Sequence, residues 1–520
     1  MPENKKIIWA DDEIFQLKPH IIFLEERGYT VEEVHSGEDA LALVQNGGYD
    51  LILLDEMMPG MDGLTTLEEI RKFDKRIPVV MITKSMEETL MEDAIGKEIA
   101  EYLVKPVNPH QILSTLKKIF ESDRIVGQQL TRDYTTEYRD MSTRPSQKAS
   151  PEQWLDLAYW LAEWDVILDN HPELGLTQTH RDFRRECNAE FGRFVELNYQ
   201  RWVWAERDER PMLSVDVAPE RLIPALRNGE KVFFILVDCM RLDQWLSVER
   251  MLSDYYTVET DVFYSLLPSA TPIARNAIFS GLFPYEISIR YPDLWIDPTE
   301  DSASRNRYEH QLLDKLIAQS GINLQGDTKY IKILDPEEGE SLVLRLKSYL
   351  SAPMTSVVAN FLDILAHSRA ASEVLREISP DESAYRSVMK TWFSHSSLLK
   401  TLRAISAENV TVIITTDHGS TIGRRGTKAF GKKDTSTNLR YKFGDNINCE
   451  ERGGIFVRNP KDWRLPAFTK TTNFIIAKED YYFVYPTHFS QFERQYRNSF
   501  LHGGISLEEM VIPVAVLRSK

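Results

Sequence analysis

Cysteine is scarce in this chain of 520 residues, and Cys187, Cys239 and Cys449 lie far apart. An odd number at such spacings predicts neither a disulfide framework nor a paired-cysteine zinc motif. Long apolar runs are also missing, since no stretch approaches the roughly 18 residues that a membrane-spanning helix needs. The first residues lead straight into a strand pattern and lack the apolar core of a signal peptide. We therefore expect a cytoplasmic protein without membrane insertion.

Basic charge is in short supply as well. The formal net charge is −17, and residues 1–121 hold 13 Lys and Arg against 24 Asp and Glu. This balance argues against nonspecific binding to a nucleic-acid backbone, which needs a basic face. No compact basic helix-turn-helix pattern is present, so we expect no sequence-specific DNA-binding domain. The length exceeds what one hydrophobic core supports and predicts about three domains, at 1–121, 122–210 and 211–520.

Residues 1–121 alternate short apolar strands with helical patterns, which predicts a doubly wound parallel sheet. Polar residues follow the ends of the expected strands. Acids that converge at strand ends repel one another unless a cation lies among them, and hard oxygen ligands suit Mg²⁺. A hydroxyl and an ammonium on the same rim would hold the oxygens of a phosphoryl group on Asp55. The five strand-end residues are Asp11, Asp12, Asp55, Thr83 and Lys105.

This segment resembles the receiver domains of response regulators over its whole length. The resemblance is carried by Asp-Asp at 11–12, D-E-M-M-P-G-M-D-G at 55–63, Thr-Lys at 83–84 and Lys-Pro at 105–106. It implies that a sensor histidine kinase phosphorylates Asp55 and that Lys105-Pro106 is a cis peptide. It also implies Mg²⁺ bound by Asp12, Asp55 and the carbonyl of Met57 with help from Asp11, and a switch pair formed by Thr83 and Tyr102.

Residues 122–210 show helical patterns and no catalytic signal. The last receiver helix has no clear stop before Pro145 and is expected to continue as a connecting helix. Two more helices are expected at 152–169 and 180–206. Five of the ten tryptophans lie in this region. At helical spacing they are more typical of a core than of a ligand site, so we interpret the region as a helical bundle.

The C-terminal part has several segments that end in metal-ligand side chains. Any one of these histidines alone is typical of a core or surface residue, and an Asp-His pair alone is compatible with a loop ion pair. A hydroxyl at a helix start joins them, because Thr271 is expected as the N-cap and Pro272 as the first helical residue. Carboxylates and imidazoles without thiolate suit a catalytic pair of Zn²⁺ or Mn²⁺. The expected strands are 232–237 before Asp238, 357–362 before Asp363 and His367, 410–414 before Asp417 and His418, and 511–517 after His502.

This part resembles the alkaline phosphatase superfamily, and within it the PglZ-type domains, over roughly 300 residues. The matching motifs are V-D-C-M-R at 237–241, S-A-T-P at 269–272, L-D-I-L-A-H at 362–367, T-T-D-H-G at 415–419 and H-G-G-I-S-L-E-E at 502–509. The resemblance implies a large α/β domain with two zinc ions, or manganese in their place. One metal is then held by Asp238, Asp417, His418 and the Thr271 oxygen, and the other by Asp363, His367 and His502.

The order of receiver, helical bundle and PglZ-type domain resembles the PorX-type response regulators, which are associated with type IX secretion. The leading hypothesis is a phosphodiesterase with Thr271 as nucleophile, acting on short or cyclic oligonucleotides. Phosphorylation at Asp55 would drive homodimerisation and control the effector. The alternative is a non-catalytic regulatory module whose metals stabilise the fold while a surface recruits a transcription or secretion partner, such as a sigma factor.

The segment 423–444 stands out in an acidic protein, with seven Lys or Arg against one acid. It begins five residues after His418. One interpretation is a solvated flexible loop, and the other is a site for an anionic substrate whose bases stack on its aromatic residues. The second interpretation assigns substrate binding to Arg424, Arg425, Lys432 and Lys433.

Overall fold

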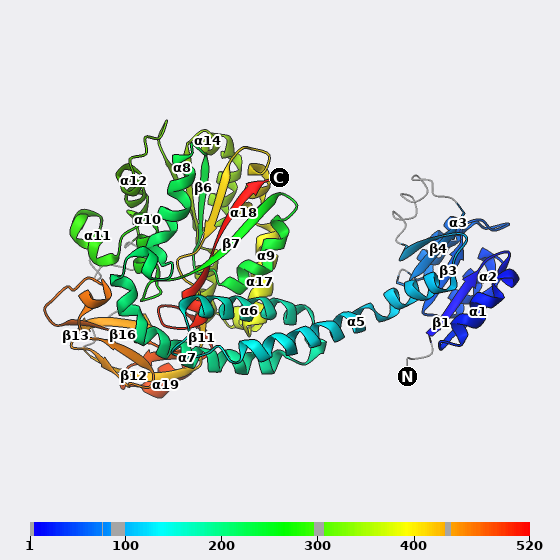
Figure 1. The fold of residues 1–520 in the computed structure, drawn as a ribbon, viewed down its shortest axis with the longest axis horizontal. Coiled ribbons are helices and arrows are strands. Elements are labelled where there is room, and N and C mark those ends of the chain that lie inside the picture. The colour runs from blue at the N-terminus through cyan, green and yellow to red at the C-terminus, as the bar shows by residue number, and fades with distance from the viewer. Residues whose placement is uncertain (1–4, 75, 85–98, 296–305, 432–437) are drawn as a thin grey trace. The chain divides into compact units, whose positions relative to one another are not determined.

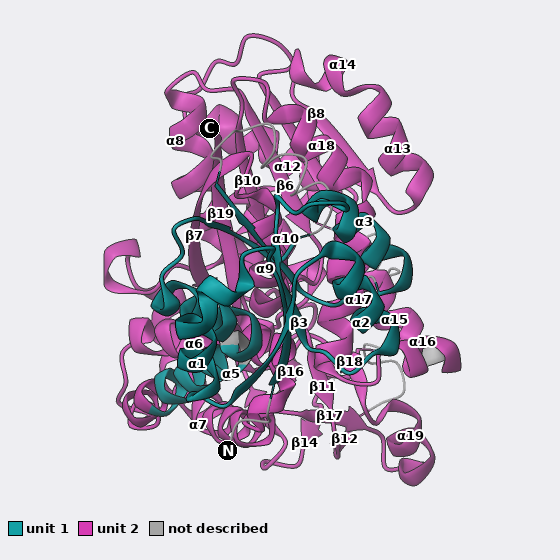
Figure 2. Cartoon of the chain, turned by 90° about the vertical axis from the view of Figure 1, so that its right-hand side faces the viewer, with its two compact units in different colours: residues 1–135 teal, residues 136–520 magenta. Residues whose placement is uncertain are grey.

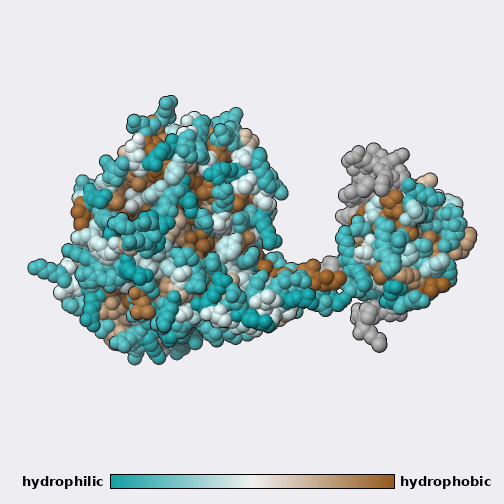
Figure 3. Space-filling model, viewed as in Figure 1, coloured by the Kyte–Doolittle hydropathy of each residue, from teal (hydrophilic) through white to brown (hydrophobic). Residues whose placement is uncertain are grey.

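The computed structural model describes residues 5–520 except for 75, 85–98, 296–305 and 432–437 (Figure 1). The chain forms two compact units, residues 1–135 and 136–520 (Figure 2). Most of the surface in Figure 3 is hydrophilic. Among the described residues, none of the helices combines the length and apolar content of a membrane span.

The first unit contains the predicted doubly wound receiver fold. Its five strands are all parallel and lie in the order β2-β1-β3-β4-β5. Every residue of β3 is buried, because helices pack on both faces of the sheet. The elements are β1 (Lys5–Ala10), α1 (Lys18–Glu25), β2 (Tyr29–Val34), α2 (Gly37–Asn46), β3 (Leu51–Asp55), α3 (Gly63–Phe73), β4 (Val79–Thr83), β5 (Glu101–Val104) and α5 (Pro109–Met141).

Helix α5 is 33 residues long and runs from the receiver into the second unit, which confirms the expected connecting helix. Helices α6 (Pro151–Asn170) and α7 (Thr177–Trp204) follow. Ser150 and Gln153 form a capping box at the start of α6. Trp160 and Trp164 of α6 both donate to Oε2 of Glu137 on α5, at 2.7 Å each. The tryptophans of α6 are buried, so they form core as expected.

A six-stranded mixed sheet, in the order β7-β19-β10-β6-β9-β8, forms the centre of the effector domain. Its strands are β6 (Val232–Val237), β7 (Tyr256–Tyr264), β8 (Lys329–Ile333), β9 (Met354–Ala359), β10 (Thr411–Thr415) and β19 (Val511–Ser519). Strands β10, β6, β9 and β8 are parallel, and β19 is antiparallel to both β10 and β7. Strand β6 is buried throughout because alternate residues enter different cores, Phe233 and Ile235 on one face and Phe234 and Leu236 on the other. Such burial on both faces explains its unbroken apolar run.

Helices cover both faces of this sheet. Core residues from α9, α13, α17 and α18 pack on one face, and those from α8, α10 and α12 on the other. The helices of this domain are α8 (Ile223–Arg227), α9 (Leu242–Glu249), α10 (Thr271–Ser280), α11 (Pro284–Arg290), α12 (Glu309–Gln319), α13 (Pro336–Leu344), α14 (Leu346–Leu350), α15 (Phe361–Ala371), α16 (Glu373–Ile378), α17 (Glu382–His395), α18 (Ser397–Ile405), α19 (Phe489–Tyr496) and α20 (Leu507–Met510).

Three small sheets lie between β10 and β19 in the sequence. Part of the basic segment 423–444 is therefore strand, which corrects its interpretation as a flexible loop for the described residues. The strands are β11 (Thr421–Gly423) with β18 (Ser499–Leu501); β14 (Asn448–Cys449), β12 (Arg425–Phe430) and β17 (Tyr481–Val484); and β13 (Tyr441–Asp445), β16 (Thr472–Ala477) and β15 (Gly454–Val457).

Two predicted boundaries near the site are wrong. The strand expected at 357–362 ends at Ala359, and α15 begins at Phe361. Leu362, Leu365 and Ala366 are buried at helical spacing, so the apolar run contains a strand and the first turn of a helix. Thr271 is the first residue of α10 rather than its cap, and Ala270 occupies the cap position without a side-chain hydrogen bond.

Candidate metal centre and phosphoacceptor site

The first candidate metal group contains Asp238, Asp417 and His418, all buried. Asp238 directly follows β6, and Asp417 and His418 follow β10. These strands are parallel neighbours, so their carboxyl ends lie together at the edge where open α/β sheets bind ligands. One ligand atom from each residue lies within 4.8 Å of the others.

The ring of His418 is oriented for ligation through Nε2. Its Nδ1 lies 3.0 Å from the carbonyl oxygen of Gly419, so Nδ1 carries the proton and donates it. Nε2 then presents its lone pair to the group, 3.8 Å from Oδ1 of Asp238 and 3.9 Å from Oδ2 of Asp417. A backbone carbonyl thus selects the tautomer that can bind a cation.

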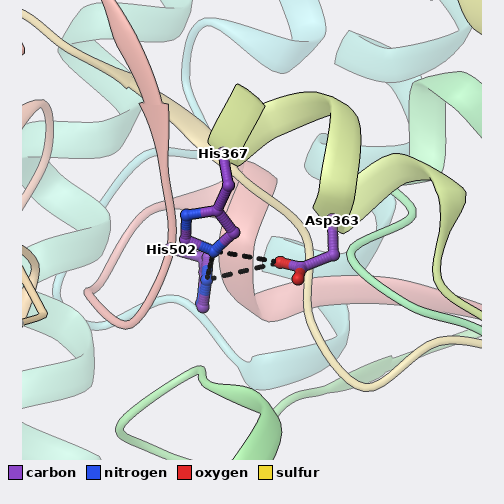
Figure 4. A group of neighbouring side chains, drawn as sticks. All are labelled: Asp363, His367 and His502. Atoms are coloured by element: carbon purple, nitrogen blue, oxygen red, sulfur yellow. Dashed lines mark hydrogen bonds and ion pairs between the residues drawn. The ribbon is translucent and has the colours of Figure 1, made fainter. Parts of the chain in front are cut away.

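The second candidate group contains Asp363, His367 and His502, and Figure 4 shows the two imidazoles meeting the carboxylate. Asp363 and His367 lie one turn apart on α15, so the wrong strand boundary does not separate them. Nε2 of His367 is 3.3 Å from Oδ1 of Asp363 and 3.3 Å from Nε2 of His502. Burial, the largest influence, lowers the pKa of His502 to about 3, so this ring is neutral.

The two groups adjoin one another and Thr271. The rings of His418 and His502 stack with their centres 4.2 Å apart. The hydroxyl oxygen of Thr271 lies 3.0 Å from Nε2 of His418. The structure therefore brings all seven residues predicted for the two-metal site together from β6, α10, α15, the loop after β10 and the loop after β18.

Both groups fit a divalent cation. Oδ1 of Asp238 is buried and has no hydrogen-bond partner in the described part of the chain, and buried Oδ1 of Asp363 lies near the two imidazoles of its own group. Leaving buried carboxylate oxygens without a partner is costly, and a cation would satisfy them. The donor sets hold only carboxylate oxygen and imidazole nitrogen, which suits Zn²⁺ or Mn²⁺.

Arg275 is a fully buried residue one turn after Thr271 on α10 that was not among the predicted site residues. Its Nε donates to Oδ2 of Asp417 at 2.9 Å, and its guanidinium also pairs with Asp238. Burial alone would raise the pKa of Asp417, but the charges of Arg275 and His418 lower it below its usual value. An arginine inside a short apolar helix is the signal that could have identified it.

In the receiver, Asp11, Asp12 and Asp55 form a third candidate group, with ligand atoms within 4.8 Å of one another. The ammonium of Lys105 bridges Asp11 and Asp55, at 2.8 and 2.9 Å. Burial, together with the charges of Asp11 and Asp12, raises the pKa of Asp55 although Lys105 opposes the shift. The arrangement fits Mg²⁺, since three carboxylates outnumber the one ammonium.

The other predicted receiver residues lie on or near the last two strands and the loop after β3. Lys105-Pro106 is a cis peptide, as expected. The buried hydroxyl of Thr83 donates to Glu56, a residue that the sequence analysis did not single out. Tyr102 is half-buried on β5, and the side chain of Met57 is exposed.

Among the basic residues assigned to substrate binding, the two that the structure describes, Arg424 and Arg425, do not line the cavity around Thr271. Arg425 pairs with Glu479 and Asp480 and stacks on Tyr481, so its charge is already balanced. Arg424 is exposed, and Lys432 and Lys433 lie outside the described residues. Substrate binding by this segment stays a prediction.

Three family descriptions match successive parts of the chain. Residues 7–117 match the response regulator receiver domain, residues 124–203 the PorX response regulator linker domain, and residues 218–517 the BREX system PglZ alkaline phosphatase-like domain. Together they account for the receiver sheet, the linker helices and the two-group centre.

Individual relatives are similar to the receiver end of the chain. The transcriptional regulatory protein ResD of Bacillus subtilis is 34% identical over 114 residues, 22% of this chain and 47% of the relative. ZraR of Salmonella typhimurium is 32% identical over 141 residues, 27% of this chain and 32% of the relative. The matches thus span less than half the length of either relative.

Among solved structures, chemotaxis protein CheY4 of Vibrio cholerae is 29% identical, with 23% of this chain and 100% of that chain covered and a TM-score of 0.22. A CheY-like receiver domain protein of Methanospirillum hungatei is 28% identical, with 23% and 96% covered and a TM-score of 0.22.

The PglZ match covers more than half of the 520 residues and contains every residue of the two effector metal groups. The receiver and linker matches precede it in the order of the PorX-type architecture. The chain therefore belongs to the PglZ alkaline phosphatase-like family, as a response regulator of the PorX type with a hydrolase-like effector.

Proposed function

We propose that the effector domain is a two-metal phosphodiesterase with Thr271 as its nucleophile. The observation that carries this proposal is the position of the Thr271 hydroxyl, 3.0 Å from Nε2 of His418 on the wall of a cavity that both metal groups share. A site that only stabilised the fold would have no use for a hydroxyl there. Thr271 also begins α10, whose first backbone N–H groups favour an anion.

The reaction divides into two displacements at phosphorus. Zinc or manganese, bound by the two groups, would lower the pKa of the nucleophile and balance the charge of the phosphoryl oxygens. Oγ1 of Thr271 loses its proton and forms a bond to phosphorus while the bond to the leaving alkoxide breaks and that alkoxide takes up a proton, which leaves a phosphodiester between Thr271 and the rest of the substrate. Water then attacks the same phosphorus in line and releases Thr271. Arg275 does not take part directly, because it is committed to Asp238 and Asp417.

A diester rather than a monoester is supported by the size of the cavity. Its volume is about 640 Å³, within the range of sites that bind drug-sized ligands, and it extends from Thr271 to Tyr441 and Tyr496. Short or cyclic oligonucleotides are substrates of suitable size, and their bases could stack on the aromatic wall.

Control of this activity is assigned to Asp55. A sensor histidine kinase would phosphorylate Asp55, the chain would dimerise, and the phosphodiesterase activity of the effector domain would change. Because the chain matches the PorX response regulator linker domain and resembles response regulators associated with type IX secretion, we assign it a role there, with a sigma factor or a secretion component as partner.

Thr271→Ala tests the enzymatic proposal. We expect loss of several orders of magnitude in hydrolysis of bis(p-nitrophenyl) phosphate, because the nucleophile is removed while Asp238, Asp417 and His418 still bind the metal. His418→Ala should lose activity and metal together. Metal content by mass spectrometry and the melting temperature are measured beside turnover.

Wild-type turnover by Thr271→Ala would disprove the covalent mechanism. If the wild-type protein, loaded with zinc or manganese, hydrolyses neither monoesters nor diesters, the effector is the non-catalytic regulatory module instead.

A further inference from the structure

The cavity that contains Thr271 is larger than one reacting phosphate requires. Its volume is about 640 Å³, and its lining includes three segments that lie outside the two metal groups and outside α10. These are the end of β8, the residues before β13, and the segment from the end of α19 through β18. Groups on these segments are placed to meet parts of a substrate other than the reacting phosphate. The chemistry of these lining groups therefore indicates the chemistry of the substrate parts that they contact.

Lys332 provides a cation on the β8 wall. It is half-buried and lines the cavity, as does Leu334 two residues later. In register, Lys332 lies opposite Val358 of β9, which in turn lies opposite Leu236 of β6, two residues before Asp238. Two strand spacings make about 10 Å. The backbone of Lys332 is thus two strands away from the strand that leads to Asp238.

This ammonium is without a partner in the part of the chain that the structure describes, with no hydrogen bond or ion pair assigned to it. The charge of Lys332 acts to lower the pKa of one acid, Glu309. Glu309 already accepts a hydrogen bond from Tyr330 and lies 3.9 Å from Arg275. The other Lys or Arg among the lining residues is Arg275, which is bound to Asp238 and Asp417. Lys332 is therefore the cation in this lining that remains available to a ligand.

We propose that Lys332 binds a second phosphate group of the substrate, next to the one that reacts at Thr271. A half-buried ammonium gains more from a phosphate than a fully hydrated one, because charge-assisted hydrogen bonds strengthen as water is excluded. The rings of Tyr441 and Tyr496 line the same cavity and provide surfaces on which a base can stack. The substrate is then a phosphodiester with at least one further phosphate, as in a nucleotide chain. This inference rests on the proposed phosphodiesterase function.

The test compares thymidine dinucleotides that differ only in a terminal phosphate, on the 5′ or on the 3′ side. Lys332→Gln should raise the ratio of KM with to KM without the terminal phosphate by about tenfold, the value of one charge-assisted hydrogen bond. Its kcat should stay close to wild type. Lys329→Gln is the matched control, since Lys329 lies on the same strand but bonds to Ser348 and should keep the wild-type ratio.

Binding gives a second readout that does not depend on turnover. Calorimetry with the same dinucleotides on Thr271→Ala, with and without Lys332→Gln, should show the same tenfold loss for the phosphorylated ligand. If Lys332→Gln weakens all ligands equally, the lysine contacts the reacting phosphate and the inference is wrong. If Lys332→Gln changes the affinity for none of the ligands, Lys332 does not bind the second phosphate and the inference is wrong. If the wild-type protein binds the dinucleotides but never cleaves them, the enzymatic function is refuted. The binding assay alone then decides whether Lys332 binds the second phosphate.

Discussion

The buried guanidinium of Arg275 lies between two carboxylates that we assign to one metal group. It contacts Asp417 through Nε and Asp238 through its terminal nitrogen, and it is fully inaccessible to solvent. Asn360 adds a hydrogen bond to Oδ2 of Asp238 at 2.8 Å. These contacts hold the acids in place and leave Oδ1 of Asp238 for a cation. The site is therefore largely built by protein contacts alone.

Arg275→Met should destabilise the metal-free protein by about 3–5 kcal/mol, because removing one partner leaves buried charges uncompensated. Added zinc should recover part of that loss, since the cation replaces the missing positive charge. Urea unfolding with and without metal measures both effects. Arg221→Met is a suitable control, because its pair with Asp261 is exposed and should be worth about 1 kcal/mol or less. Equal losses in the two variants would contradict this role for Arg275.

At the scale of elements, the linker helices contact the loops that carry metal ligands. Asn188 of α7 donates to Glu508 and accepts from the backbone N–H of Leu507, just after the loop of His502. Arg184 of α7 pairs with Asp165 of α6 and lies 3.7 Å from Glu508. Movement of these helices would therefore reach the second metal group through buried polar contacts.

A second set of buried charges begins at Arg241, three residues after Asp238. Its guanidinium pairs with Asp243 and Glu382 and donates to the carbonyl of Ser420, two residues after His418. Arg386 of α17 joins Asp243 to Asp169 at the end of α6. This ionic network thus joins the linker to the segments that follow Asp238 and His418 in the chain.

The packing of α7 on α6 should make stability depend on pH. His180 is buried on α7, where Nε2 donates to the carbonyl of Leu161 at 3.0 Å and lies 3.6 Å from Asp165. Burial, aided by the charge of Arg386 and opposed by Glu382, lowers the pKa of His180 from 6.5 to about 4.

Because the unfolded chain takes up this proton first, His180 should destabilise the fold as the pH falls from 6.5 towards 4, by up to about 3 kcal/mol. Above pH 6.5 His180 is neutral in both the folded and the unfolded chain, so its protonation contributes nothing to the free energy of unfolding. Urea unfolding of wild type and His180→Gln across this range measures it. A variant with the same slope as wild type would show that other groups set the acid limit.

At the scale of the whole molecule, phosphorylation has a continuous element through which to act. Helix α5 passes from the receiver unit into the effector unit, and it exposes Ile125 and Val126 by 47% and 44%. A phosphoryl group on Asp55 would compete for Lys105 and for the hydroxyl of Thr83, which now bond to Asp55 and Glu56. Such a change shifts an equilibrium between states only through contacts that differ between them.

We expect beryllofluoride with Mg²⁺ to convert the protein from a monomer to a two-fold dimer at micromolar concentration. Light scattering measures the mass, and Asp55→Asn, which cannot accept the phosphoryl mimic, should remain monomeric. A mass that stays the same across the concentration range in the wild type would count against dimerisation as the output of the receiver.

Local patterns in the sequence are sufficient for much of this architecture. Apolar runs of five or six residues specify the buried strands, and ligands lie at the carboxyl ends of parallel strands, which is where Asp55, Asp238 and Asp417 follow those runs. The spacing of four between Asp363 and His367 puts them on one helix face, so it survives the misplaced end of β9. These inferences succeed because each depends on neighbours in the chain.

Tertiary structure alone decides what surrounds those ligands. Arg275 meets Asp417 across 142 residues, and Asn188 meets Glu508 across 320. The stacking of His418 on His502 and the unpaired position of Lys332 in the cavity, among the described residues, likewise depend on distant segments. No periodicity encodes such contacts, because the pairing of buried charges depends on which side chains folding excludes from water together. The sequence therefore determined which residues could bind metals, and the fold determined how those residues are held and which charge is left for a substrate.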